Sequence, residues 1–154
     1  MIRELKHIAP HIAHGLTCNL MGEFDAKKDA PLVFKVTGID QRFIEIDNGA
    51  HHYEIESEEF FPLLRPMSDL FENIVHNGEI VCVAKVIKED AFVLHELYYD
   101  LSFKQNALIL RSLGEVMDFD KLSELPFFVV EILFKYHFDV FGLIEKGLAQ
   151  PLKT

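Results

Sequence analysis

The stretch PFFVVEILFKYHFDVFGLIEKGL, from Pro126 to Leu148, holds the densest apolar and aromatic run in the sequence. Pro126 suits the first position of a helix, where its fixed φ fits and no N–H is needed. Up to His137, the polar residues of this run are Glu131, Lys135 and His137 itself. A helix that is apolar around most of its girth is buried. The rest of the chain is therefore expected to cover a helix that begins at Pro126.

The second half of the run predicts a bend and a second, shorter helix. Asp139 can act as the N-cap of VFGLIEK, Gly147 offers a left-handed cap, and Pro151 prevents continuation. The charges of Glu131, Lys135 and Asp139 oppose membrane insertion, because a central charge costs about 2.5–3.5 kcal/mol. We expect a helical hairpin or bent helix that packs against a sheet or against a second copy of itself, as in a homodimer. No contact with a membrane is expected.

The first 65 residues predict short antiparallel strands. Apolar and polar residues alternate over 32–38 and 42–47. Asn48-Gly49, which lies between 42–47 and a further strand at 51–56, is typical of a hairpin turn because both residues tolerate positive φ. Four or five such strands commonly curl into a small barrel or sheet. The segment 60–66 contains two prolines, which exclude it from a central strand, so it is expected to connect this part to the next.

The middle of the chain carries weaker patterns. Asn77-Gly78 predicts a second hairpin, 91–103 fits either a strand or a helix, and 104–113 favours a helix. The expected fold is therefore α+β, in a single domain of 154 residues. A small N-terminal antiparallel β-barrel-like sheet at 1–65 would pack with a C-terminal part at 66–154 that is mixed to helical.

Composition indicates a soluble protein with a large core. Apolar residues make up 49% of the chain, and 14 residues are phenylalanine. Cys18 and Cys82 are isolated, which is typical of reduced cysteines in a cytosolic protein. The first 15 residues contain no apolar run long enough for a signal peptide. The cytoplasm is the expected location.

The net charge of −10 is concentrated in one region. Between Arg42 and Arg65 there are acidic residues and no lysine or arginine to offset them. Because affinity for nucleic acid rests mainly on lysine and arginine, direct nucleic-acid binding is not expected. This acidic face is either a solvated surface or a docking site for a basic protein partner. Its members are Glu45, Asp47, Glu54, Glu56, Glu58 and Glu59.

No motif identifies a reaction or a cofactor. The sequence contains no glycine-rich phosphate loop, no HExxH and no GxSxG. His7, His11 and His14 have helical spacing, but Pro10 is expected to interrupt or restart the helix and to separate His7 from the other two. His11 and His14 are then the weak candidates for metal ligands, and two ligands are too few for a zinc site. No metal or other cofactor is expected, and catalytic residues stay unknown.

Four segments carry a resemblance to a known group of proteins. They are LPFFVVEILFKYHFDVFGLIEKGLA at 125–149, LLRPMSDL at 63–70, HNGE at 76–79 and, more loosely, HIAPHIAHGL at 7–16. Together they resemble small phage- and prophage-encoded proteins that have no assigned activity. The resemblance implies an accessory protein that works in the bacterial cytoplasm.

The expected function is therefore that of a non-enzymatic phage or prophage accessory protein. It would act by binding another protein, such as a host factor or a defence component. The alternative is a metal-dependent hydrolase or nuclease that uses histidines and carboxylates from separate segments.

Overall fold

The computed structural model describes residues 3–26, 30–40, 42–95, 100–104, 107–112, 115–119 and 125–152, with side chains described outside 92–119. The fold is α+β and divides into two compact units. The first unit joins Met1–Arg65 to Phe141–Lys153 near the end of the chain, and the second holds Pro66–Val140. Each unit has its own hydrophobic core.

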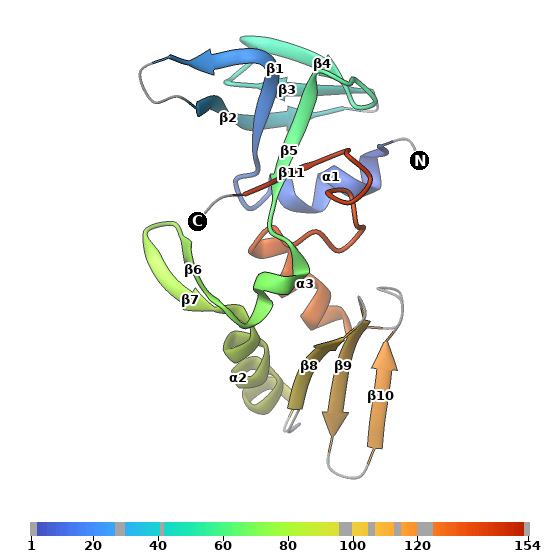
Figure 1. The fold of residues 1–154 in the computed structure, drawn as a ribbon. Coiled ribbons are helices and arrows are strands. Elements are labelled where there is room, and N and C mark those ends of the chain that lie inside the picture. Colours follow the sequence, from blue (N-terminus) through green and yellow to red (C-terminus); the bar gives the residue numbers. More distant parts are fainter. Residues whose placement is uncertain are drawn as a thin grey trace. The chain divides into compact units, whose positions relative to one another are not determined.

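The first unit is built on a six-stranded sheet that is mainly antiparallel (Figure 1). Its strand order is β11-β5-β1-β2-β3-β4. β11 runs parallel to β5, and the other pairs are antiparallel. The strands are β1 (Thr17–Asp25), β2 (Ala30–Ile39), β3 (Phe43–Ile46), β4 (His51–Glu54), β5 (Phe60–Leu64) and β11 (Gln150–Pro151).

This sheet is not a closed barrel. Among the described residues, β4 pairs with β3 alone and β11 pairs with β5 alone, so both remain edge strands. The expected barrel-like closure is therefore corrected to an open sheet. Its sixth strand, β11, comes from the other end of the chain and pairs through two residues only.

The β3–β4 hairpin confirms the prediction from Asn48-Gly49. Asn48 and Gly49 have φ values of 55° and 87°, and Asp47 before them has a φ of 50°. In the register, Ile44 lies opposite Tyr53 and Glu45 opposite His52. The residues of the turn determine its conformation, because asparagine and glycine adopt a left-handed backbone at little cost.

β5 contradicts the prediction that 60–66 is only a connector. Pro62 lies opposite Cys18 in a strand that has neighbours on both sides, β1 and β11. Pairing with β11 begins at Leu63, one residue after the proline. The missing N–H of Pro62 is thereby kept out of the β11 pairing, which explains why the proline is tolerated.

Helix α1 (Leu5–Ile12) is continuous through Pro10, which corrects the predicted interruption. In a helix of 8 residues, Pro10 removes one intrahelical hydrogen bond and leaves the others in place. The helix buries His7, Ile8 and His11. The core of the unit gathers residues of α1, the sheet and the C-terminal segment: Ile8, Leu16, Cys18, Leu20, Val36, Ile44, Ile46, Ile55, Phe60, Leu64, Leu143 and Ala149.

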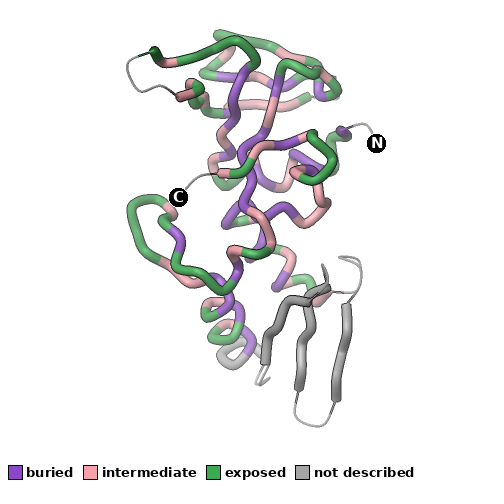
Figure 2. The backbone as a smooth tube through the Cα atoms, viewed as in Figure 1, coloured by how far each residue is buried: buried purple, intermediate pink, exposed green. Residues whose placement is uncertain are grey.

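The second unit begins with a short 3-10 helix, η1 (Met67–Phe71), and a hairpin of β6 (Asn73–His76) and β7 (Glu79–Cys82). Asn77 and Gly78 form its turn with φ values of 52° and 83°, as the sequence predicted. Figure 2 shows the turn of this hairpin as exposed, and α2 (Val83–His95) follows, with buried, intermediate and exposed residues mixed over 83–91. Helix α2 is thus amphipathic, with one face in the core.

A three-stranded antiparallel sheet follows α2. Its strands are β8 (Asp100–Lys104), β9 (Ala107–Ser112) and β10 (Glu115–Phe119), in the order β10-β9-β8. The helix predicted over 104–113 is therefore wrong. Propensity favoured a helix here, but the pairing of β9 with strands on both sides determines the structure.

Helix α3 (Phe127–Lys135) occupies the run that was expected to organise the fold. Pro126 stands just before it as the N-cap, with an extended ψ of 138°. Residues 139–149 form turns, so the predicted second helix is wrong. Gly142, with a φ of 63°, breaks that segment, while Gly147 does adopt the predicted left-handed conformation with a φ of 68°.

The buried side of α3 packs within the second unit. Val129, Ile132 and Leu133 are buried, whereas Phe127 is 75% exposed. Their core includes residues of η1, the β6–β7 hairpin and α2: Leu70, Ile74, Val83, Ala84 and Ile87. In the part of the chain that the structure describes, neither α3 nor any other helix has the length and apolar character needed to cross a membrane.

Candidate functional site

The outer face of the β3–β4 hairpin carries polar and charged side chains. Because side chains alternate along a strand, Ile44 and Ile46 point into the core and Phe43 and Glu45 point away from it. Glu54 lies opposite Phe43 in the register and shares its face. β4 is also an edge strand, so this face borders unpaired backbone groups.

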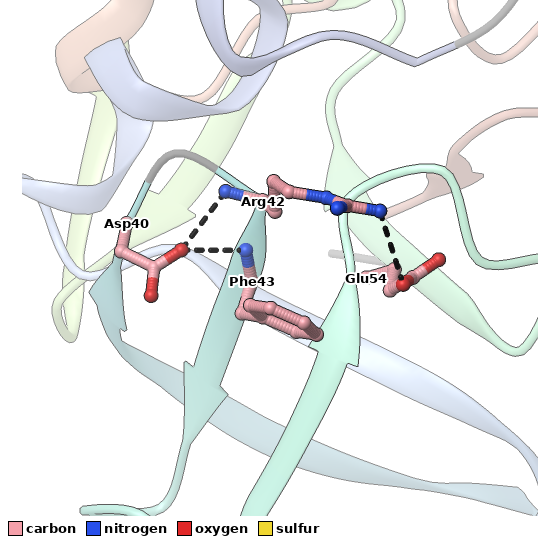
Figure 3. Close-up of polar contacts among 4 residues, drawn as sticks. All are labelled: Asp40, Arg42, Phe43 and Glu54. Carbon is pink, nitrogen blue, oxygen red and sulfur yellow. Dashed lines mark hydrogen bonds and ion pairs between the residues drawn. The ribbon is translucent and has the colours of Figure 1, made fainter.

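The turn before β3 is held by Asp40. Its Oδ1 accepts hydrogen bonds from the backbone N–H of Arg42 at 2.9 Å and of Phe43 at 2.8 Å (Figure 3). These two bonds hold the pKa of the Asp40 carboxyl below its usual value. The turn places Arg42 beside Glu54, with 3.6 Å between Nη2 and Oε1. Both side chains are exposed, so the pair contributes little to stability.

The six residues of the predicted acidic face fall into two groups. Glu45 and Glu54 lie on the hairpin, and Asp47 lies in its turn, where Oδ1 accepts a hydrogen bond from the N–H of Lys35 at 3.1 Å. The others are exposed residues of the β4–β5 connection: Glu56, Glu58 and Glu59.

Only part of this negative charge is offset. Arg42, at the boundary of the region, pairs with Glu54. Within the described residues, Glu56, Glu58 and Glu59 form no ion pair. The β4–β5 connection therefore presents three uncompensated carboxylates next to an open strand edge.

Arg3 holds the β4–β5 connection through hydrogen bonds to its backbone. Its Nε donates to the carbonyl of Leu148 at 3.0 Å, and its Nη1 donates to the carbonyls of Ile55 at 3.1 Å and Ser57 at 3.2 Å. The guanidinium carbon lies 5.0 Å from the centre of the Phe60 ring. Burial lowers the pKa of Arg3 to about 10, so the side chain stays charged at neutral pH.

A cleft of about 220 Å³ opens at the start of α1. Both Arg3 and members of the acidic face line this cleft. The lining residues are Arg3, Glu4, Leu5, Arg42, Glu54, Ile55 and Glu56.

The N-terminal histidines lie in different environments. His7 is buried and accepts a hydrogen bond at Nδ1 from the N–H of Glu4 at 3.0 Å, and its ring centre lies 4.8 Å from that of Phe141 in a tilted arrangement. His11 is buried on the same helix, and His14 is exposed in the turn that follows it. In the described ranges, no three His, Cys, Asp or Glu side chains are grouped so as to hold a metal ion.

Histidines also meet in the second unit. The ring of His76 lies 4.8 Å from Tyr136 and 5.8 Å from His137. His137 is buried and adopts a left-handed φ of 61° directly after α3. This cluster joins the β6–β7 hairpin to the end of α3.

Sequence reasoning missed Arg3. Its acceptors stand 52, 54 and 145 positions away along the chain, so no local spacing signals them. The one available signal was weak: an arginine in a segment that otherwise begins with apolar residues and leads into a helix.

Comparison with models of known protein families found no match, and neither the curated proteins nor the solved structures contain a match to this chain.

Proposed function

We propose that this chain is a non-enzymatic accessory protein that binds a basic protein partner on its acidic face. The observation that supports this function is the exposed, uncompensated group of Glu56, Glu58 and Glu59 beside edge strand β4. Charge of one sign attracts a complementary partner and speeds encounter. The open edge offers backbone groups to an extended segment of that partner.

The same features have a competing explanation. Charged side chains on an edge strand also prevent unwanted pairing between sheets. A protective role requires only that the charges be present, whereas a docking role requires a partner that contacts them. The test must therefore locate the contact.

Phage or prophage origin and a place in the bacterial cytoplasm belong to this proposal. They rest on the resemblance of 125–149 and 63–70 to small phage-encoded proteins. A metal-dependent hydrolase is not favoured by any arrangement of the described residues.

Zero-length carbodiimide cross-linking in a bacterial lysate tests the proposal, because it joins carboxylates directly to lysine amines. We expect one protein to be linked through its lysines to the segment 56–59 in stoichiometric amount. Pull-down without the cross-linker then tests the contact itself, because a variant with Glu54, Glu56, Glu58 and Glu59 changed to Gln should no longer retain that protein.

A matched control removes the same number of charges elsewhere. Its changes are Glu23→Gln, Glu72→Gln, Glu79→Gln and Glu89→Gln, all at exposed positions. This variant should keep the cross-linked partner. Equal loss in both variants, or a partner retained by the acidic-face variant, would contradict docking on this face.

A further inference from the structure

Some of the charged residues that line the cleft at the start of α1 form ion pairs, and others do not. Two of its glutamates have basic neighbours: Glu4 Oε2 lies 2.8 Å from Lys6 Nζ, and Glu54 pairs with Arg42. Two charged lining residues remain outside these pairs: the cation Arg3 and the anion Glu56.

Arg3 is a buried cation with no acidic partner. The residue is 3% exposed, and its Nε and Nη1 donate hydrogen bonds to backbone carbonyls. Among the described residues, Nη2 donates to no group, and Arg3 forms no ion pair. A buried charge is costly unless it is paired, so a negative group at Nη2 would be stabilising.

Glu56 is the opposite charge in the same cleft. It is exposed, and within the described ranges it pairs with no base, Arg3 included. Leu5 and Ile55 supply apolar lining between the charged residues. The cleft thus offers a guanidinium, a carboxylate and an apolar surface.

From this arrangement we propose that the cleft binds a carboxylate group that is joined to a cationic group. The ligand's carboxylate would accept a hydrogen bond from Arg3 Nη2, and its cation would lie against Glu56. Two sources share this chemistry: a free basic amino acid, and the C-terminal lysine or arginine of a polypeptide.

Size and charge restrict the ligand further. The cleft has a volume of about 220 Å³. One amino acid fits this space, whereas pockets for drug-sized ligands are about 300–1,000 Å³. A phosphate dianion is disfavoured, because three glutamates line the same cleft.

The inference deepens the proposed function only for a polypeptide ligand, since that ligand would be the end of a basic partner. For a free amino acid it stands independently. Binding of small probes is measured on the purified full chain, without a partner protein. Its outcome is therefore independent of the cross-linking result.

Titration with three probes, followed by backbone amide NMR shifts, tests the proposal. L-arginine carries all the required groups, N-acetyl-L-arginine mimics a peptide C-terminus, and L-argininamide lacks the carboxylate. We expect L-arginine or N-acetyl-L-arginine to shift the amides of Leu5 and Ile55. L-argininamide should bind about tenfold more weakly or worse, because a hydrogen bond to a charged group is lost.

Binding of N-acetyl-L-arginine would identify a polypeptide C-terminus as the ligand, and binding of L-arginine alone would identify the free amino acid. Equal binding of L-argininamide would overturn the proposal and show general attraction to an acidic surface. Absence of shifts at Leu5 and Ile55 with millimolar probe would also overturn it.

Two exposed glutamates provide matched variants that avoid the buried Arg3. Glu56→Gln should weaken binding of the preferred probe about tenfold, by loss of a charged partner. Glu23→Gln removes the same charge from an exposed position outside both the cleft lining and the acidic face, and should leave the affinity unchanged. The reverse order of effects would overturn the assignment of Glu56.

Discussion

Burial shifts the pKa of individual side chains in the first unit. His7 is an example of a base. Burial lowers the pKa of His7 below its ordinary value of 6.5, although the nearby Glu4 acts in the opposite direction. The ring meanwhile accepts a hydrogen bond at Nδ1, which requires the neutral form at that nitrogen. His7 is therefore held neutral by the fold.

Stability should accordingly decrease on acidification. Below about pH 6.5 the unfolded chain binds a proton at His7 that the folded chain does not, so the free energy of unfolding falls as pH decreases toward the lower folded pKa. Urea unfolding between pH 7.5 and about pH 5 measures this. His7→Asn keeps an acceptor for the N–H of Glu4 and removes the titration. If the free energy of unfolding of this variant depends on pH as in the wild type, His7 is not the source of the pH dependence.

Cys18 shows the same effect for an acid. It is fully buried in β1, and burial first, then Asp47, raises its pKa to about 12. A thiol reacts as the thiolate, so Cys18 should be inert in the native protein. Cys82 is only partly buried and donates to the carbonyl of Phe71 at 3.5 Å.

Thiol counting with a disulfide reagent at pH 8 should therefore detect one reactive group in the native chain and two after unfolding. Cys82→Ala should abolish the native reaction and leave one group in urea. Rapid modification of Cys18 in native Cys82→Ala protein would contradict its burial.

At the scale of elements, α3 ends in a Schellman motif with an unusual residue. The N–H of Phe138 donates to the carbonyl of Leu133 at 2.9 Å, and the N–H of His137 donates to that of Phe134 at 3.0 Å. His137 thus occupies the left-handed position that glycine commonly fills. Its backbone is strained while its ring lies in a buried cluster.

Comparing two substitutions measures this strain. His137→Gly and His137→Ala both remove the ring, but only alanine keeps a Cβ in the left-handed region. The glycine variant should be more stable than the alanine variant by about 1 kcal/mol in urea unfolding. Gly147→Ala, at a φ of 68°, should lose about as much and serves as the control. Equal stability of the two His137 variants would contradict the strain.

Sequence patterns predicted the elements whose cause is local and missed those whose cause is distant. Asn48-Gly49 and Asn77-Gly78 form the predicted hairpins because turn residues determine their own backbone. The two prolines predicted that Pro62 lies outside a central strand, but one of the two partners of β5, Gln150–Pro151, comes from the far end of the chain. The acidic residues were visible in the sequence, but only folding brings Arg3 and Glu56 to the lining of one cleft.

At the scale of the whole chain, the first unit is discontinuous in sequence. Residues 141–153 return to it and complete it in three ways. Leu143 and Ala149 enter its core, the carbonyl of Leu148 accepts a bond from Arg3, and the side chain of Asn19 donates to Gln150 at 2.7 Å. The stability of the N-terminal sheet therefore depends on the last residues of the chain.

Leu143→Ala tests this dependence, because it removes buried volume from the first core and should cost about 2–5 kcal/mol. Hydrogen exchange should become faster in β1 and β5, which are distant in sequence, and change less in α3, which ends at Lys135. Leu133→Ala, in the core of the second unit, should show the opposite distribution. Were Leu143→Ala to expose α3 while β1 and β5 kept their protection, the division into these two units would be wrong.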